Sequence, residues 1–121
     1  MLQSLTPMLR TKQIKETIEF YVQILGFTCN HFSEEWGWTS LKKDNIQVML
    51  ATENGHMPFN HCNFTGSLYF NITNASALWQ QLKGKTIICY PIKDFEYGMR
   101  EIAIFDNTGY LLQFGENINR G

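Results

Sequence analysis

The sequence of 121 residues predicts an α+β fold made of two strand-helix-strand-strand-strand modules. Two observations indicate it. Apolar residues change from alternate spacing to helical spacing and back, and the same order of segments recurs after roughly 60 residues. The first module is expected at about residues 1–52, a linker at 53–65 and the second module at about 66–116. A chain of this length suits one domain, in which two curved mixed sheets, each backed by one helix, face a common concavity.

The first module is predicted from one helix and four extended segments. "TKQIKETIEFYVQILGF" places five apolar residues at helical spacing and ends at Gly26, which suits a helix C-terminus. These five are Ile14, Ile18, Tyr21, Val22 and Leu25. "SLTPMLRT" before the helix is expected to be extended, with Pro7 in an edge or first-strand position. "FTCNHF", "EWGWTSLKK" and "IQVMLA" follow as strands, the last two joined by a tight turn at Asp44 and Asn45.

The second module repeats this order. "SLYFNIT" alternates apolar and polar residues, as a half-buried strand does. "NASALWQQLKGK" is expected to form a helix, with Thr73 or Asn74 as its N-cap and one apolar face made of Ala75, Leu78, Trp79 and Leu82. "TIICYPI", "REIAIF" and "GYLLQF" are the remaining strands, the last two joined by the loop 106–109.

Composition narrows the possible partners. Hydrophobic residues make up 44% and charged residues 17%, and ten basic residues are balanced by eleven acidic ones, which argues against a nucleic-acid partner. No apolar run approaches the roughly 20 residues that span a bilayer, so no membrane partner is expected. Three widely spaced cysteines, Cys29, Cys62 and Cys89, are expected to be buried thiols. They suit a reducing compartment, so a cytoplasmic location is expected.

One cluster could suggest a metal. "HMPFNHC" brings together His56, His61 and Cys62, but a zinc site there would lack a fourth ligand. The segment is therefore interpreted as a linker with incidental histidines.

Two further stretches indicate a family. "FYVQILGF", at the end of the first helix, and "FDNTGYLLQF", a hairpin followed by the last strand, resemble the vicinal oxygen chelate superfamily. That superfamily includes glyoxalase I, extradiol dioxygenases, and the fosfomycin- and bleomycin-resistance proteins. The resemblance covers nearly the whole chain, and "YGMREIAIFDNTGYLLQFGE" is most similar to the bleomycin-resistance-like branch. It implies two βαβββ modules forming paired curved mixed sheets, the glyoxalase/bleomycin-resistance fold.

The resemblance also implies where metal ligands would lie. The four ligand positions of the family's metal enzymes fall at Thr6, Met49, Ser67 and Gln113. None of these is His, Asp or Glu, so the set is a poor match for zinc, iron, manganese or nickel. No metal and no other cofactor is therefore expected.

Strand alternation predicts which side chains line the concavity. Pairing of Asp106 with Tyr110 across the last hairpin would set Gln113 opposite Ala103 and place Glu101 on the same face, whereas a one-residue slip would present Arg100. The turn at 44–45 would pair Met49 with Ser40 and put Trp36 and Trp38 on one face. Met8 and Arg10 follow Thr6 inward. The predicted ligand-binding residues are Arg10, Trp36, Trp38, Met49, Tyr69, Glu101 and Gln113.

Two classes of function fit these residues. In the first, the protein is a metal-independent binding protein that sequesters a planar or aromatic small molecule, as the resemblance to bleomycin-resistance proteins implies. In the second, it is an enzyme of the superfamily acting on a small metabolite, with Glu101 as general base and Tyr97 or Arg100 stabilising developing charge. Aromatic residues also fill cores and dimer contacts, so the two tryptophans fit either role. A two-fold homodimer is expected from the resemblance and from the small size.

Overall fold

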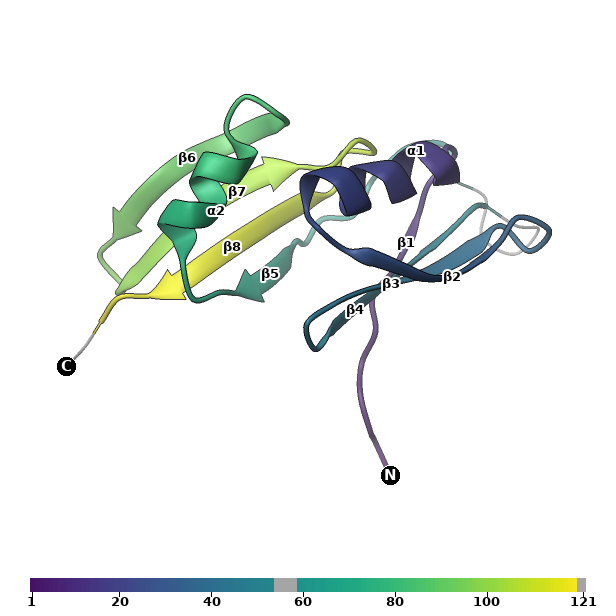
Figure 1. Cartoon of the computed structure of the whole chain (residues 1–121), viewed down its shortest axis with the longest axis horizontal. Helices are drawn as coiled ribbons and strands as arrows, with labels where there is room; N and C mark the ends of the chain where they lie inside the picture. Colours follow the sequence, from purple (N-terminus) through teal and green to yellow (C-terminus); the bar gives the residue numbers. More distant parts are fainter. Residues whose placement is uncertain (54–58, 120–121) are drawn as a thin grey trace. The chain divides into compact units, whose positions relative to one another are not determined.

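The structure, a computed structural model, describes residues 1–53 and 59–119. Over these residues it has two four-stranded mixed sheets and two short α-helices (Figure 1). The chain divides into two compact units, Met1–Cys62 and Asn63–Gly121, each with one sheet and one α-helix. The predicted α+β fold, with the order strand, helix and three strands occurring twice, is confirmed.

The first unit holds one sheet in the order β1-β4-β3-β2, with β1 parallel to β4 and the other pairs antiparallel. α1 packs against β3 and β4. The core between them includes Leu41, Val48 and Leu50, all almost fully buried. The elements are β1 (Met8–Arg10), α1 (Ile14–Glu19), η1 (Phe20–Ile24), β2 (Thr28–Ser33), β3 (Trp38–Lys43) and β4 (Ile46–Ala51).

The first helix differs from its prediction in type. It runs as an α-helix only to Glu19 and continues as a π-helical turn, η1. The apolar spacing along the sequence does not predict this change of helix type. Tyr21, on the π-helical turn, is 0% exposed. The Tyr21 ring packs edge-on against the Phe27 ring, with the two ring centroids 5.7 Å apart. Gly26, with φ +81°, ends the helix as predicted.

The second unit repeats the arrangement with the order β5-β8-β7-β6, and α2 lies across one face of this sheet (Figure 1). β5 is parallel to β8. Ile102, Ile104 and Leu112 are fully buried on the sheet, as is Leu82 on α2. The elements are β5 (Leu68–Asn71), α2 (Ala75–Leu82), β6 (Ile87–Phe95), β7 (Met99–Phe105) and β8 (Leu111–Asn117).

Both predicted hairpin registers are confirmed. Ser40 pairs with Met49, and Ala103 pairs with Gln113. The second register is fixed by Asp106, whose backbone N–H donates to the Tyr110 carbonyl at 3.0 Å. Its side-chain Oδ1 accepts from the backbone N–H groups of residues 108, 109 and 110 at 2.9 to 3.0 Å. A buried carboxylate with three local donors leaves the loop one conformation, and therefore the strands one register.

The expectation of buried cysteines is wrong for Cys29 and Cys89, which are exposed, and Cys62 is half-buried. The two exposed cysteines lie on the edge strands β2, which is exposed over most of its length, and β6, along which exposed and half-buried residues alternate. Within the part of the chain that the structure describes, no helix is long and apolar enough to cross a bilayer.

Candidate functional site

An open hollow of about 550 Å³ lies on the first unit. β1 and β3 build it through the sheet register, because Arg10, Ala51 and Trp38 form one row across three strands. Met8 lies two residues before Arg10 on the same face. The side chains that give the hollow its chemistry are Met8, Arg10, Trp36, Trp38, Thr52 and Glu53.

Trp36 reaches the hollow from a turn, not from the strand in which it was predicted. β3 begins only at Trp38, because Gly37 has φ +62° and interrupts the extended chain. The Trp36 backbone N–H donates to Ser33 Oγ at 3.1 Å, which helps to close this turn. Trp36 is 80% exposed as a residue, so its indole is available to a ligand.

Charged groups flank the two indoles. The Arg10 guanidinium donates from Nη1 to the carbonyl of Thr52, another residue of the lining, at 3.1 Å. The Glu53 carboxylate accepts the Phe59 backbone N–H at 2.9 Å. The hollow therefore combines an apolar, aromatic wall with one group of each charge.

Met49 is placed next to the hollow rather than in its lining. It pairs with Met8 on one side and Ser40 on the other, two rows along the sheet from Arg10, and it is half-buried. The structure thus brings together three of the predicted ligand-binding residues, Arg10, Trp36 and Trp38, in one hollow.

The other three predicted residues, Tyr69, Glu101 and Gln113, belong to a network on the second unit. Glu101 is 2% exposed, and its carboxylate accepts hydrogen bonds from three tyrosine hydroxyls. Tyr90 and Tyr97 donate to Oε1 at 2.9 and 2.8 Å, and Tyr69 donates to Oε2. Tyr69, Tyr90, Tyr97 and Glu101 are called the tyrosine cluster below.

A second set of hydrogen bonds extends the cluster. Gln113 Nε2 donates to the Tyr90 hydroxyl at 3.0 Å, and Ser67 Oγ donates to Gln113 Oε1 at 2.6 Å. Three successive hydrogen bonds thus link Ser67 to Gln113, Gln113 to Tyr90 and Tyr90 to Glu101. They fix the orientation of the Gln113 amide and of the Tyr90 phenol.

The sheet makes room for this network at one position. Gly115 pairs with Glu101 on β7 and with Asn71 on β5. A Cβ atom at Gly115 would collide with the Tyr69 hydroxyl and would lie 2.7 Å from Tyr69 Cζ. The absence of a side chain at this position allows Tyr69 to cross β8 and reach the Glu101 carboxylate.

Sequence reasoning missed Tyr90. β6 carries two register shifts, one between Ile88 and Tyr90 and one between Tyr90 and Lys93, so simple alternation along this strand fails. The available signal was Pro91, because a proline inside a strand indicates an edge or a bulge.

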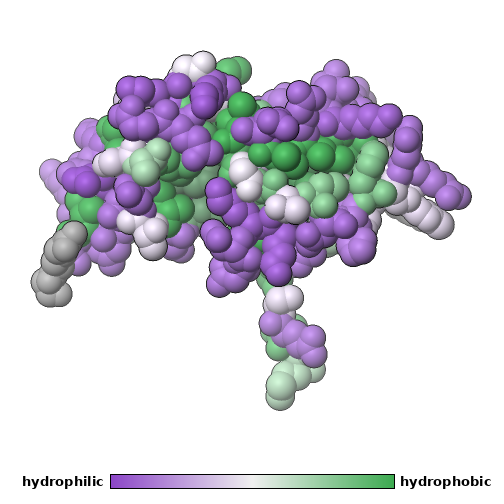
Figure 2. Space-filling model, in the orientation of Figure 1, coloured by the Kyte–Doolittle hydropathy of each residue, from purple (hydrophilic) through white to green (hydrophobic). Residues whose placement is uncertain are grey.

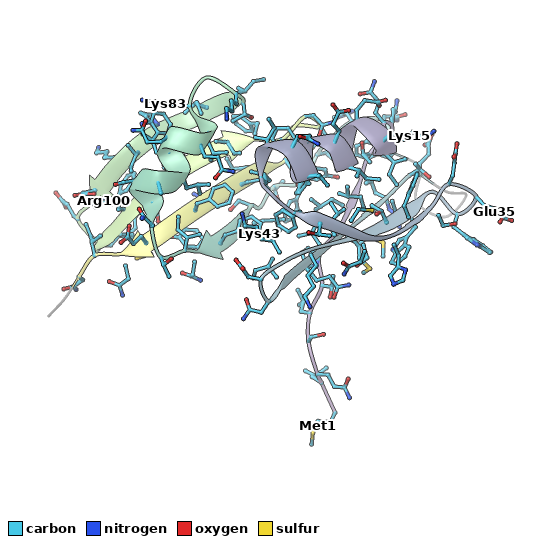
Figure 3. The ribbon with its side chains drawn as sticks, in the orientation of Figure 1. Met1, Lys15, Glu35, Lys43, Lys83 and Arg100 are labelled. Atoms are coloured by element: carbon cyan, nitrogen blue, oxygen red, sulfur yellow. The ribbon has the colours of Figure 1, made fainter. Side chains whose placement is uncertain are left out.

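The slipped register that would present Arg100 is excluded. Glu101 is buried in the cluster, while Arg100 forms a two-point ion pair with Asp94, from Nε at 2.6 Å and from Nη2 at 3.0 Å. Arg100 lies at the start of β7 (Figure 3). Adjacent strand residues point to opposite faces, so Arg100 does not reach the carboxylate of its neighbour.

The phenols of the cluster are neutral donors at physiological pH. The hydrogen bond to Glu101 is the main cause that raises the pKa of Tyr97 to about 12. Burial first, and then the Glu101 hydrogen bond, raises the pKa of Tyr69. Burial also raises the pKa of Tyr90, although the hydrogen bond from Gln113 acts in the opposite direction.

The residues at the family's metal positions do not fit a divalent metal. Ser67 and Gln113 are hydrogen-bonded to each other, and Thr6 and Met49 offer neither imidazole nor carboxylate. Within residues 1–53 and 59–119 there is no group of three His, Cys, Asp or Glu side chains able to hold a metal. Of the histidine-rich segment, His56 lies outside the described residues.

The family is shown by the sequence itself. The sequence model of the Glyoxalase/Bleomycin resistance protein/Dioxygenase superfamily matches residues 4–114 of the chain. The chain belongs to this superfamily. No curated protein sequence matches the chain.

Several solved structures share the fold at low identity. TioX from Micromonospora sp. ML1 has a TM-score of 0.78 at 15% identity, covering 95% of this chain and 98% of its own. A bleomycin resistance determinant encoded on the transposon Tn5 has a TM-score of 0.74 at 19% identity, covering 96% and 98%. A glyoxalase/bleomycin resistance protein/dioxygenase from Nocardioides has a TM-score of 0.79 at 15% identity, covering 100% and 87%.

Proposed function

We propose that this chain is a metal-independent binding protein that sequesters a planar or aromatic small molecule. The observation that carries the proposal is the pair of tryptophans in one hollow. Trp36 and Trp38 share the hollow with the Arg10 guanidinium and the Met8 side chain. Indole faces stack on planar ligands of many kinds, and a few polar groups then fix the ligand's orientation.

The hollow has the dimensions and the chemistry of a ligand site. Its volume of about 550 Å³ falls within the range of small-molecule pockets. Arg10 and Glu53 provide one polar anchor of each charge, and Trp36 leaves most of its indole open to a ligand. A core role would bury this indole, so its 80% exposure favours ligand binding over core packing.

The similarity in fold to a bleomycin resistance determinant supports sequestration as a mode of action. The net charge of this chain is only −1, however. A protein that attracts a polycation such as bleomycin over long range gains from a strong acidic excess. A ligand of low net charge is therefore the better fit to the whole chain.

The proposal is tested by thermal shift with a panel of aromatic metabolites and, separately, divalent metals. A ligand at 100 times its dissociation constant stabilises the folded state by about 2.7 kcal/mol. Trp36→Ala removes an exposed indole and is expected to weaken the best organic ligand by about tenfold. Trp79→Phe on α2 is the matched control, since Trp79 belongs to the second unit and lies outside the hollow.

Two outcomes would overturn the proposal. One is a strong stabilisation by divalent metals, and the other is an unchanged ligand affinity in Trp36→Ala. Mass spectrometry of the bound compound separates the two classes of function, because a changed compound would show a superfamily enzyme acting on a small metabolite.

A further inference from the structure

The Glu101 carboxylate is buried, and among residues 1–53 and 59–119 it forms no ion pair. Its three hydrogen-bond donors are all neutral phenols. In the described part of the chain the ion pairs join Lys15 to Glu34 and Arg100 to Asp94, so neither involves Glu101. A carboxylate 2% exposed is normally paired with a cation, because neutral donors satisfy its lone pairs but do not neutralise its charge.

The two cations nearest to it along the sheet are engaged elsewhere. Lys93 stands opposite Glu101 in the strand register, but its Nζ lies over the Phe95 ring, 5.4 Å from the centroid. The Arg100 guanidinium is held by Asp94 at 2.6 and 3.0 Å. Within the described residues, these two side chains are therefore not paired with Glu101.

The geometry of the carboxylate leaves one acceptor position open. An ionised carboxylate offers about four lone-pair directions, two on each oxygen. Tyr90 and Tyr97 occupy those of Oε1, and Tyr69 occupies one on Oε2. The positive charge of an incoming group can therefore face the open side of Oε2, whether or not that group carries an N–H donor.

Aromatic rings surround this position and are accessible. Tyr69 is 41% exposed and Tyr97 is 63% exposed. Tyr97 stacks on Phe95 with ring centroids 5.3 Å apart, and Phe95 meets the Tyr90 ring edge-on at 5.6 Å. Ring faces attract cations, and the Lys93 ammonium over Phe95 shows that attraction within this patch.

We propose that the tyrosine cluster is a binding site for an organic cation, an alkylammonium group that sits against Glu101 Oε2 and the ring faces of Tyr69 and Tyr97. The carboxylate supplies charge, the rings supply cation–π attraction, and Gly115 supplies the space that lets Tyr69 take part. This inference concerns side chains of the second unit alone and does not depend on the aromatic hollow of the first.

The test uses choline and its neutral isostere 3,3-dimethyl-1-butanol as probes, with the tyrosine ring resonances followed by NMR. Choline is expected to give saturable shifts on the rings of the cluster, and the alcohol is not. Glu101→Gln keeps the shape of the side chain and removes its charge, so it is expected to weaken choline by about tenfold or more. Glu96→Gln is the matched control, since it removes one exposed carboxylate from the neighbouring turn.

A second variant keeps the test decisive if Glu101→Gln does not fold. Tyr97→Ala leaves the carboxylate in place and removes a ring that is 63% exposed, and it is expected to weaken choline while the fold is retained. Trp36→Ala is expected to leave choline binding unchanged, so failure of this site and failure of the aromatic hollow are separate results. Equal shifts with choline and the alcohol, or full choline affinity in Glu101→Gln or Tyr97→Ala, would overturn the inference.

Discussion

At Tyr97 a single hydrogen bond, rather than burial, is the main reason that the phenol resists ionisation. The hydrogen bond to Glu101 is the largest of the causes that raise the pKa of Tyr97 from 10.0 to about 12, whereas burial is the largest cause at Tyr69. Because the folded-state pKa lies above the unfolded value, this contribution to stability is complete below pH 10 and is lost as the pH rises through about 12.

An alkaline titration of tyrosinate absorbance checks this. In the wild type, Tyr97 is expected to ionise near pH 12, and its step is identified by its absence in Tyr97→Phe. In Glu101→Gln the Tyr97 pKa should fall back toward 10.0, while that of Tyr69 stays raised because burial remains. Ionisation of Tyr97 near pH 10 in the wild type would contradict the assigned hydrogen bond.

Single residues also show what the sequence can and cannot predict. Glu101 and Gln113 could be placed on one face because Asp106 and Gly109 predict a hairpin loop, and the length of that loop fixes the register of β7 against β8. The partners of Glu101 could not be predicted, because Tyr90 reaches it only through two register shifts in β6. Tyr97 reaches it from the turn before β7, where alternation gives no guidance.

Among the elements, α2 shows how one side chain defines a helix boundary. Asn74 is its N-cap, as predicted from the alternatives Thr73 and Asn74, and Oδ1 accepts the Ala77 backbone N–H at 3.0 Å. The Ala75 backbone N–H is satisfied separately by Glu116 Oε1 of β8 at 2.9 Å. The two contacts together fix the helix start and dock it on the sheet.

Asn74→Ala is expected to lower the free energy of unfolding by about 1 kcal/mol, because the N–H of Ala77 loses its acceptor. Urea unfolding measures this, with Ser76→Ala as the control on the exposed side of the same helix turn. Equal stability of Asn74→Ala and the control would show that the cap contributes nothing.

The first helix and β3 show what the spacing of apolar residues does not predict. The apolar spacing of the first helix correctly predicts its span to Gly26 but not the π-helical turn at Phe20–Ile24. "EWGWTSLKK" alternates like a strand throughout, yet Gly37 adopts a positive φ that splits it into a turn and β3. In both cases backbone conformation, which the side-chain period does not encode, decides the outcome.

For the whole molecule, the doubled pattern was sufficient to predict the architecture. Two copies of one segment order leave few ways to bury two helices and two sheets, and the superfamily fold is one that repeats in this way. The candidate site was less predictable. The sequence places seven residues in one concavity, whereas the structure gives a hollow on the first unit and a hydrogen-bonded cluster on the second. A shared concavity therefore stays a prediction.

The expected two-fold homodimer would cover apolar surface that is exposed in the single chain. Apolar side chains are open to solvent in the single chain, among them Leu2 at 98% and Leu5 at 89% in the segment before β1. This segment extends away from the first unit and carries apolar as well as polar residues (Figure 2). Met1 lies at its end (Figure 3). Ile87 on the edge strand β6 is 70% exposed. A second copy would cover such surface, and two-fold pairing is the commonest way to do so.

Light scattering at micromolar concentration is expected to give twice the chain mass of 14.1 kDa. A double variant, Leu2→Ser with Leu5→Ser, removes apolar area without touching either sheet, so it should shift the equilibrium toward monomer if this segment contributes to the contact. Thr108→Ser, a conservative change in the loop between β7 and β8, is the control for handling and concentration. A monomeric mass for the wild type across the micromolar range would contradict the dimer.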